Sequence, residues 1–466
     1  MPLEFLIGAV VPSMRPHPYP GVIPYHGIRF PGTNMLSFAL RLGLLALAAA
    51  AAGSCEVTFH ENVEPILQKH CQECHRLGQI APFSLLTYTD ARPWAKSIRE
   101  NVLSKKMPPW FADPKYGHFT NDRSLNRQEI DTLAAWVDGG AKEGDPKSAP
   151  KPLTFVEGWN IPKPDLVLGM SQPFHLPAKG EVPYQYLVLP TQFTEDQWVQ
   201  MAEARPTDRS VVHHIVVFVR GPRSNWLRDA TPGVPYAPPP GDFKNISGGG
   251  NELLMGYTPG KTPDVWGPGQ GKLIRAGSDL VLQIHYTPNG KPAEDQTKIG
   301  LVFTKEKPAE RVVGVAAQNL SFEIPPGDPN YRVDSKRFFP NGATVLAFLP
   351  HMDLRGKAFE YRAVYPDGRT EVLLRVPRYD FFWQLDYKLA EPLKLPPGSS
   401  IECSAWYDNS ANNPRNPDPA ATIRFGEQSW EEMMVGFYDM VMPAEANLRE
   451  LLTPRRAPDQ AGGGSQ

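Results

Sequence analysis

Two cysteines and a histidine stand together near the start of the chain, in the run CQECH at residues 71–75. A C-x-x-C-H run attaches haem covalently, because its two thiols bond to the haem vinyl groups while the following histidine binds the iron. A thioredoxin-like redox pair and half of a zinc site have similar spacing. However, no second cysteine pair and no βαβ pattern accompany this one. The run therefore predicts a haem c held by Cys71, Cys74 and His75.

A second iron ligand is expected downstream of this run. Met107 offers a soft thioether in the proline-stiffened stretch KKMPPW, and we predict it as the axial ligand opposite His75. His118 is the alternative ligand, and a surface methionine without a role is the remaining interpretation of Met107. Ligation by His and Met raises the reduction potential of a haem, which suits it to accept electrons.

Four further histidines, His213, His214, His285 and His351, lie within or at the end of strand-like runs, where packing gives no reason for them. Taken singly, each is more often a structural residue. Neighbouring strand residues point to opposite faces, so His213 and His214 can share a metal only at a strand end or a bulge. Three neutral imidazoles suit copper, zinc or iron. We predict a metal site made of His213, His214 and His285.

A second metal site is predicted from His351, Asp353 and Met433. In the run FLPHMDLRG, His351 closes a strand, and alternation places Asp353 on the same side. Met433 and Met434 lie beside a later strand-like run, and a thioether ligand selects Cu(I). Ordinary core packing of both methionines is the competing interpretation.

The elements that position these residues change in character along the chain. Apolar residues recur at helical spacing over 59–75, and a second helix is expected to begin at Asn126, with Glu129 completing a capping box, and to end at Gly139-Gly140. The stretch 149–165 is proline-rich and reads as a linker. Beyond it, alternating runs predict strands. These runs are 186–189, 211–219, 280–286, 345–349 and 371–376.

Within the run 280–286, alternation puts His285 on one face with Val281 and Gln283, and Leu280, Leu282 and Ile284 on the other. The predicted fold class is a small all-α domain followed by all-β tandem jelly rolls or β-sandwiches.

Composition limits the functions that remain. A chain of 466 residues suggests about three domains. The formal net charge of -2 gives no reason to bind nucleic acid. The 51 prolines and 39 glycines exclude long helical bundles over most of the length.

The N-terminal stretch predicts export. Residues 36–54 place Arg41 before an apolar run that ends in small residues, as in a secretory signal, and the run is short for a membrane-spanning helix. Translation is expected to begin at Met35. Cys55 stands where a lipid-attachment cysteine would, and cleavage by an ordinary signal peptidase is the alternative. The chain is thus predicted to be periplasmic or on the outer surface, with a lipid anchor at Cys55 as one option.

Two resemblances accompany these motifs. About residues 55–145 resemble a class I cytochrome c, on CQECH, MPPW and EIDTLAAWVDGGA. Residues 165–442 are similar to the copper type II, ascorbate-dependent monooxygenases, the family of peptidylglycine alpha-hydroxylating monooxygenase and dopamine beta-monooxygenase. The motifs that carry this second resemblance are VVHHIVVFV, LVLQIHYTPNG, LPHMDLRG and SWEEMM.

The second resemblance implies two jelly-roll subdomains, each with one copper. His213, His214 and His285 would hold the electron-transfer copper, and His351 with Met433 the oxygen-activating copper. The chain departs from the family where Asp353 replaces the second His of H-x-H. A carboxylate binds Cu(I) poorly, so the second site is expected to be weak. Cys403 has no evident disulfide partner, and the arginine that binds a peptide carboxylate is absent before His351.

Together these features predict an exported haem c and copper protein that hydroxylates a C–H bond of a small organic substrate with O2. Its electrons would come from a periplasmic redox partner through the haem, in place of ascorbate. The alternatives are an electron-transfer or copper-binding protein without oxygenase activity, and a jelly-roll binding module with structural histidines. The predicted division is leader 1–54, cytochrome c domain 55–148, linker 149–165, jelly rolls 166–308 and 309–445, and disordered tail 446–466.

Overall fold

The computed structural model describes residues 56–238 and 251–453 of the chain. The predicted signal segment, the start at Met35 and the attachment site at Cys55 all lie outside the described residues. The described residues from Val57 onward form one compact unit. Within the described part, no helix has both the length and the apolar character needed to cross a membrane.

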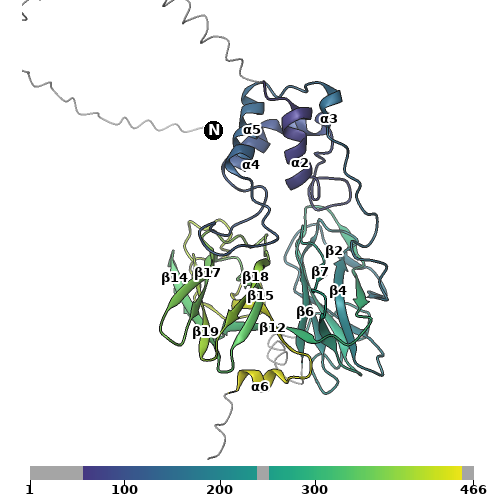
Figure 1. Ribbon diagram of the computed structural model, residues 1–466, viewed down its shortest axis with the longest axis vertical. Helices are drawn as coiled ribbons and strands as arrows, with labels where there is room; N and C mark the ends of the chain where they lie inside the picture. Colours follow the sequence, from purple (N-terminus) through teal and green to yellow (C-terminus); the bar gives the residue numbers. More distant parts are fainter. Residues whose placement is uncertain (1–55, 239–250, 454–466) are drawn as a thin grey trace, which may run out of the picture. The chain divides into compact units, whose positions relative to one another are not determined.

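The first region is helical, as its apolar spacing predicts (Figure 1). Its elements are η1 (Phe59–Val63), α2 (Glu64–His70), α3 (Tyr88–Ala91), η2 (Arg92–Trp94), α4 (Ala95–Leu103), α5 (Arg127–Asp138) and η3 (Pro146–Ser148). Phe59, Leu67 and Trp136 are fully buried in their shared core. The first helix ends at His70, so residues 71–75 form a turn rather than the expected last helical turn.

The capping box that begins α5 is confirmed. The Asn126 side chain accepts a hydrogen bond from the Glu129 backbone N–H at 2.9 Å, and the Glu129 carboxylate accepts one from the Asn126 N–H at 2.9 Å. The helix ends before Gly139, as predicted. Neither a helix nor a strand lies between Ala149 and Asp165, in agreement with the predicted linker.

The second region is built from strands, and all five predicted runs are confirmed as strands. A first β-sandwich encloses an apolar core between two layers, with Leu187, Val199 and Ile299 completely buried in it. One layer contains β1 (Leu166–Gly169), β4 (Gln197–Arg205), β7 (Asp264–Val265), β8 (Gln270–Ile274) and β11 (Lys298–Phe303). The other contains β3 (Gln185–Pro190), β5 (Val212–Arg220), β6 (Glu252–Tyr257) and β9 (Asp279–Tyr286), and β2 (Phe174–Leu176) pairs with β10 (Ala293–Asp295).

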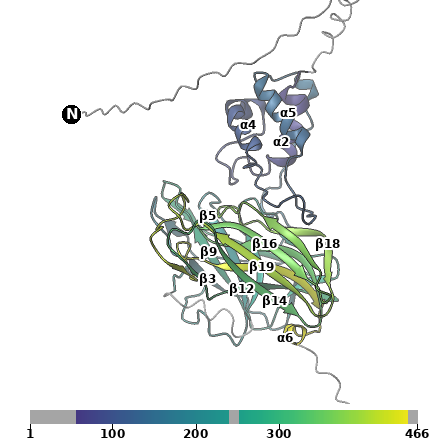
Figure 2. The same cartoon turned by 90° about the vertical axis from the view of Figure 1, so that its left-hand side faces the viewer.

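A second β-sandwich follows, with Phe348, Tyr361 and Tyr407 buried in its core. One layer contains β12 (Glu310–Asn319), β15 (Ala343–His351), β18 (Tyr387–Leu395) and β21 (Met434–Pro443). The other has the order β14 (Tyr331–Phe339), β19 (Ser399–Tyr407), β16 (Gly356–Val364) and β17 (Thr370–Val376). Figure 2 shows the first three of these strands side by side. A short pair joins β13 (Glu323–Ile324) to β20 (Ile423–Arg424).

Strand β12 connects the two sandwiches. β12 pairs with β21 over its whole length. Gly314 of β12 also pairs with Leu253 of β6, and the first residues of β12 pair in parallel with β8. The sheets of the two sandwiches are therefore hydrogen-bonded to each other. This continuity fixes the first sandwich, with its histidines, relative to the second.

The predicted cytochrome c segment 55–148 reaches beyond its helices. Phe119 forms a bridge with Leu389 of β18, the Thr120 N–H donates to the Lys388 carbonyl at 2.8 Å, and the Ala390 N–H donates to the His118 carbonyl at 2.8 Å. Trp110 packs against Tyr387 with ring centroids 4.9 Å apart. Residues 110–120 thus pack against the second sandwich, with Trp110 and Phe111 in its core, which sequence periodicity did not reveal.

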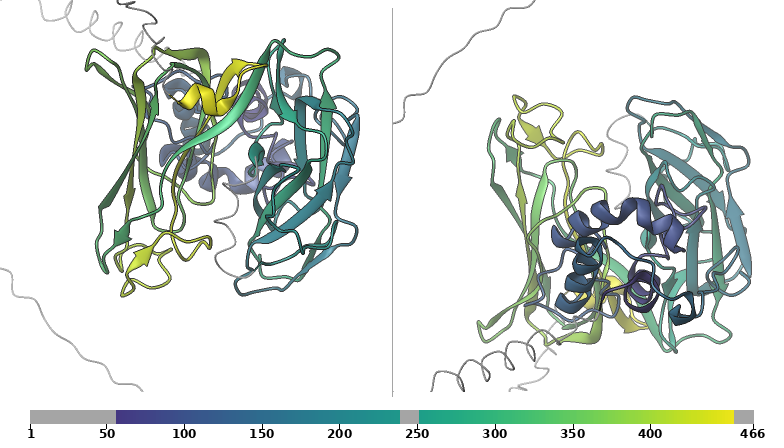
Figure 3. Two further views of the ribbon diagram at one scale, coloured as in Figure 1. Left: turned by 90° about the horizontal axis from the view of Figure 1, so that it is seen from below. Right: turned by 90° about the horizontal axis from the view of Figure 1, so that it is seen from above.

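The tail predicted to be disordered from residue 446 contains a short helix, α6 (Leu448–Leu452), so that prediction is wrong for its first residues. The Asn447 side chain caps the helix by accepting from the Arg449 N–H at 2.9 Å. Three leucines of the helix pack against the core of the second sandwich: Leu448, Leu451 and Leu452. The left view of Figure 3 shows this helix, in yellow, at one end of the sandwich. Burial of these leucines holds the segment in place.

Candidate metal centre

A β-bulge brings the two adjacent histidines together. In the pairing of β5 with β9, Val212 lies opposite Tyr286 and His214 opposite His285, so His213 is an extra residue without a partner. An extra residue turns the strand locally and re-aims its side chain. The condition set by strand alternation, that these histidines can share a metal only at a bulge or strand end, is met.

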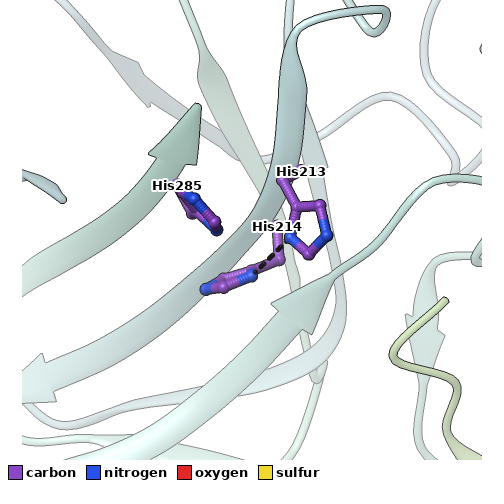
Figure 4. A group of neighbouring side chains, drawn as sticks. All are labelled: His213, His214 and His285. Carbon is purple, nitrogen blue, oxygen red and sulfur yellow. Dashed lines mark hydrogen bonds between the residues drawn. The ribbon is translucent and has the colours of Figure 1, made fainter. Parts of the chain in front are cut away.

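The three histidines form a compact group, shown in Figure 4. One ligand nitrogen from each of His213, His214 and His285 lies within 4.8 Å of the other two, and all three residues are buried. The Nδ1 atoms of His213 and His214 are 3.0 Å apart and share one hydrogen bond. The Nε2 atoms of these two residues, and Nδ1 of His285, have no hydrogen-bond partner in the described part of the chain.

Burial keeps these imidazoles neutral. Loss of solvent, followed by the proximity of His351, lowers the pKa of His213 to about 3. The pKa values of His214 and His285 are lowered well below the usual range, first by burial and then by neighbouring imidazoles. A metal is bound by the neutral form of histidine, in which each ring has one nitrogen lone pair. One of these lone pairs accepts the hydrogen bond between His213 and His214, so a metal would replace that bond. This group can hold a metal ion.

His351 lies at the end of β15, close to this group. Its ring centroid is 6.0 Å from that of His214. Its Nδ1 donates to Gln384 Oε1 at 2.8 Å, and its Nε2 lies 3.2 Å from the Met433 sulfur. With the proton on Nδ1, the Nε2 lone pair and the thioether converge. His351 and Met433 are thus brought together as predicted, from β15 and from the residue before β21.

The two neighbouring methionines have different surroundings. Met434 is fully buried in the core of the second sandwich, as the packing interpretation expects. Met433 is not part of that core and faces His351, while its carbonyl accepts a hydrogen bond from the Tyr407 hydroxyl at 2.8 Å. Only Met433 is placed to be a ligand.

A cavity of about 270 Å³ lies between the two sandwiches at this point. His214 lines one side, on β5, and His351 and Met433 line the other. Most of the wall is apolar, with Val216 and Leu253 from the first sandwich and Phe437 from the second. Candidate ligands of both predicted metal sites therefore border one apolar space.

Asp353 is not brought to this cavity. β15 ends at His351, so the strand alternation on which its placement was predicted does not extend to residue 353, and that premise was wrong. Its two carboxyl oxygens are buried and have no hydrogen-bond partner in the described part of the chain. Burial, and then the charge of Glu432, raise the pKa of Asp353 well above its usual range. Both effects favour the protonated carboxyl, which is the weaker ligand form.

Glu432 organises the backbone around Asp353. Its carboxylate accepts hydrogen bonds from the Asp353 N–H at 2.9 Å and the Arg355 N–H at 2.6 Å. The Arg355 guanidinium is also buried and donates to Asn409 Oδ1 at 2.9 Å. These bonds anchor the turn after His351 to the residue before Met433, so they hold the two candidate ligands at a fixed separation.

The CQECH run occupies the turn after α2. Cys71 and Cys74 are free thiols, and burial raises the pKa of the Cys71 thiol to about 12. Cys74 lines a second cavity, of about 280 Å³, together with Arg209, Tyr257 and Lys261. His75 and Met107 are not among the described residues that line it. His118 is exposed and its backbone is bound to β18.

The sequence did not indicate several residues that surround the histidines. Phe381 stacks on His213 with ring centroids 4.4 Å apart, and Tyr184 lies 4.7 Å from the ring of His285. Gln384, which orients His351, follows Phe381 in the aromatic run YDFFWQ at 379–384. This aromatic run lies between two strands and ends in an amide, and that pattern could have indicated Gln384 from the sequence.

Comparison with known proteins adds no assignment. No protein-family model matches the chain and no curated protein matches it. A structure of infectious bursal disease virus, Gx strain, is similar with a TM-score of 0.18 and 9% identity, over 60% of this chain and 72% of that chain. A VP2 subviral particle of the same virus gives a TM-score of 0.17 and 10% identity, over 62% and 75%. Similarity this low carries no argument about fold or function.

Proposed function

We propose that this protein is an exported copper-dependent oxidoreductase of the monooxygenase-like class, with a covalent haem as its internal electron donor. The observation that carries this proposal is that His214 of the three-histidine group and the His351–Met433 pair border one apolar cavity. Copper bound by imidazole and thioether ligands supplies one-electron transfer and oxygen chemistry. The cavity between the sandwiches would receive a small organic substrate.

The residues present fit copper at the first position. Three neutral imidazoles with unpartnered nitrogens are the donor set that suits this metal, and zinc and iron compete for the same set. Phe381 and Tyr184 pack on the imidazoles and restrict access of water. At the second position, Gln384 holds the proton of His351 on Nδ1 and so keeps Nε2 available beside the Met433 sulfur.

The residues around Cys71 and Cys74 support a haem in part. The two thiols are unpaired with each other, and the cavity beside Cys74 also has Arg209 in its wall, a cation that suits a carboxylate group. The proposal assigns thioether bonds to both cysteines and iron ligation to His75, with Met107 as the second ligand. The tandem jelly-roll topology and the cytochrome c domain belong to this proposal as well.

Metal analysis with a visible spectrum, on protein matured in a bacterial periplasm, tests the proposal. Two copper ions per haem support the oxygenase, and oxygen uptake with a reduced haem donor would accompany them. Haem that stays with the denatured chain through acid–acetone extraction supports covalent attachment. Cys71→Ala should release part of it, whereas Cys403→Ala, a buried cysteine elsewhere, should not. Complete extraction of haem from the unaltered chain would contradict the assignment.

A second candidate function is electron transfer or copper binding without oxygenase chemistry. Asp353 favours it, because the side chain that stands in place of the family's second histidine does not line the cavity that His351 borders. The second position then has one imidazole and one thioether. One copper per haem, bound at His213, His214 and His285, with no oxygen uptake would favour this function over the oxygenase. Absence of copper would favour a binding module.

A further inference from the structure

We infer that the cavity between the sandwiches takes a small, uncharged and mainly apolar molecule that carries a hydrogen-bond-accepting oxygen, such as a carbonyl. The inference rests on the proposed function in treating this cavity as the substrate site, and it adds the chemical class of the substrate. Three features of the cavity carry it: its size, its lack of charge and its unpartnered donors.

Size and charge set the first limits. A volume of about 270 Å³ lies just below the range of roughly 300–1,000 Å³ that is usual for ligand pockets, so the ligand is small. Among the described residues that line it there is no Asp, Glu, Lys or Arg. A charged ligand would lose its hydration without gaining an ion pair, at a cost that an apolar wall cannot repay. An anion such as a peptide carboxylate is therefore disfavoured.

Two polar side chains in the wall lack partners. Gln384 Nε2 and Thr258 Oγ1 are buried and have no hydrogen-bond partner in the described part of the chain, and both residues line the cavity. Gln384 is 5% exposed and Thr258 is 7% exposed. Buried polar groups in proteins are almost always hydrogen-bonded. An accepting oxygen on the ligand would satisfy them.

Gln384 also gives the ligand an orientation. Its Oε1 already accepts the His351 proton, so its amide NH₂ is left as a donor. A ligand oxygen bound there lies next to His351. The apolar part of the molecule then extends along the wall formed by Leu253 and Val216 on one side and Phe437 on the other. Recognition by donors in an apolar wall selects neutral oxygenated molecules over both hydrocarbons and acids.

The test uses three probes of nearly equal shape: acetophenone, isopropylbenzene and benzoate. Each is titrated into full-length protein freed of copper, and binding is followed by ligand-observed NMR. The inference expects both neutral probes to bind and benzoate to bind at least tenfold more weakly than acetophenone. Since isopropylbenzene is the more apolar probe, the decisive quantity is the ratio of the acetophenone affinity to the isopropylbenzene affinity, compared between variants.

Thr258→Val keeps the side-chain shape and removes the hydroxyl, so the affinity ratio should fall about threefold to tenfold. Gln384→Leu should lower it similarly. Thr191→Val is the matched control, because that buried threonine already donates to the Ser278 carbonyl at 2.6 Å and lies outside the cavity. Val435→Phe, which fills the space, should weaken both neutral probes.

An unchanged ratio in both Thr258→Val and Gln384→Leu would overturn the inference, as would benzoate binding as well as acetophenone. None of these measurements needs copper or turnover. If the protein binds no copper or consumes no oxygen, while the probes still behave as expected, the proposed function fails and the assigned ligand class stands. If copper and oxygen uptake are present and no neutral probe binds, the ligand class alone fails.

Discussion

Loss of one ligand from the three-histidine group should abolish stabilisation by copper. His285→Ala removes one of the three nitrogens that lie within 4.8 Å of one another. A ligand bound only by the folded state at a hundredfold excess over its dissociation constant stabilises by about 2.7 kcal/mol. For a domain of this size, 1 kcal/mol corresponds to roughly 2–4 °C in Tm, so copper should raise the Tm of the unaltered protein by about 5–11 °C.

The stability of the copper-free protein should change little in His285→Ala, because the substitution has two opposing effects at the site. The alanine substitution removes a buried imidazole whose Nδ1 has no partner in the described structure, which relieves about 1–3 kcal/mol of desolvation. It also removes the packing of His285 against Tyr184, at a ring distance of 4.7 Å, and leaves a cavity. The two effects oppose each other. The informative quantity is therefore the copper-induced shift, not the stability of the copper-free chain.

The assay is thermal unfolding followed by circular dichroism, with and without excess Cu(II), on haem-containing protein stripped of copper. His175→Ala is the control, because His175 lies on β2 of the same sandwich with a side chain that is 73% exposed and pairs with Glu294. It should keep the full shift, and His285→Ala should lose most of it. Equal shifts in His285→Ala and in the unaltered protein would refute the metal assignment.

Three further outcomes are expected. Gly436→Ala should destabilise the second sandwich by about 1–3 kcal/mol, since a Cβ there would lie 2.6 Å from the Cys403 sulfur. Adding Cys403→Ala should restore part of the lost stability, measured by urea titration. Cys403 itself, a buried thiol with a raised pKa, should resist alkylation until the protein unfolds, as peptide mapping would show. Glu129→Gln should cost about 1 kcal/mol at pH 7 in urea titrations.

The pH dependence of the Glu129 variant follows from its surroundings. Burial alone would raise the pKa of Glu129, but the hydrogen bond from the Asn126 backbone and the side chains of Lys69 and His70 outweigh it and hold the pKa below its ordinary value of 4.5. A carboxyl with a lowered folded pKa stabilises above its unfolded pKa, and this stabilisation is lost as the pH falls. The difference between Glu129→Gln and the unaltered protein should therefore shrink below about pH 4.5, and a constant difference down to pH 3 would argue against it.

Local patterns in the sequence predicted the elements well. Alternation in the run 280–286 placed Leu280, Leu282 and Ile284 in the core of the first sandwich, and Val281 on the other face, as observed. Strand alternation requires a bulge or a strand end if His213 and His214 are to share a metal, and β5 has a bulge at this point. Residue propensities alone do not predict that bulge. Both predictions depend on strand geometry that repeats every two residues, so a few positions suffice to determine which face each side chain occupies.

The predictions failed where the two-residue alternation of the strands ends. Asp353 was placed by alternation, but β15 ends two residues earlier, and the turn that follows is set by Glu432 from a distant segment. The association of residues 118–121 with β18 depends on backbone hydrogen bonds between segments about 270 positions apart, which carry no local pattern. The sequence therefore indicated the histidines of the candidate site, but not the residues that support them through such contacts.

One of these supporting segments explains why the two candidate sites adjoin. The loop between β17 and β18 contacts both: Phe381 stacks on His213 of the first sandwich, and Gln384 binds His351 of the second. Strand β12 joins the sheets of the sandwiches by hydrogen bonds at the same time. A change in the separation of the sandwiches would therefore break the Phe381 stacking or the Gln384 hydrogen bond, unless the loop moved as well. The arrangement therefore favours a fixed distance between the three-histidine group and the His351–Met433 pair, on the two sides of the apolar cavity.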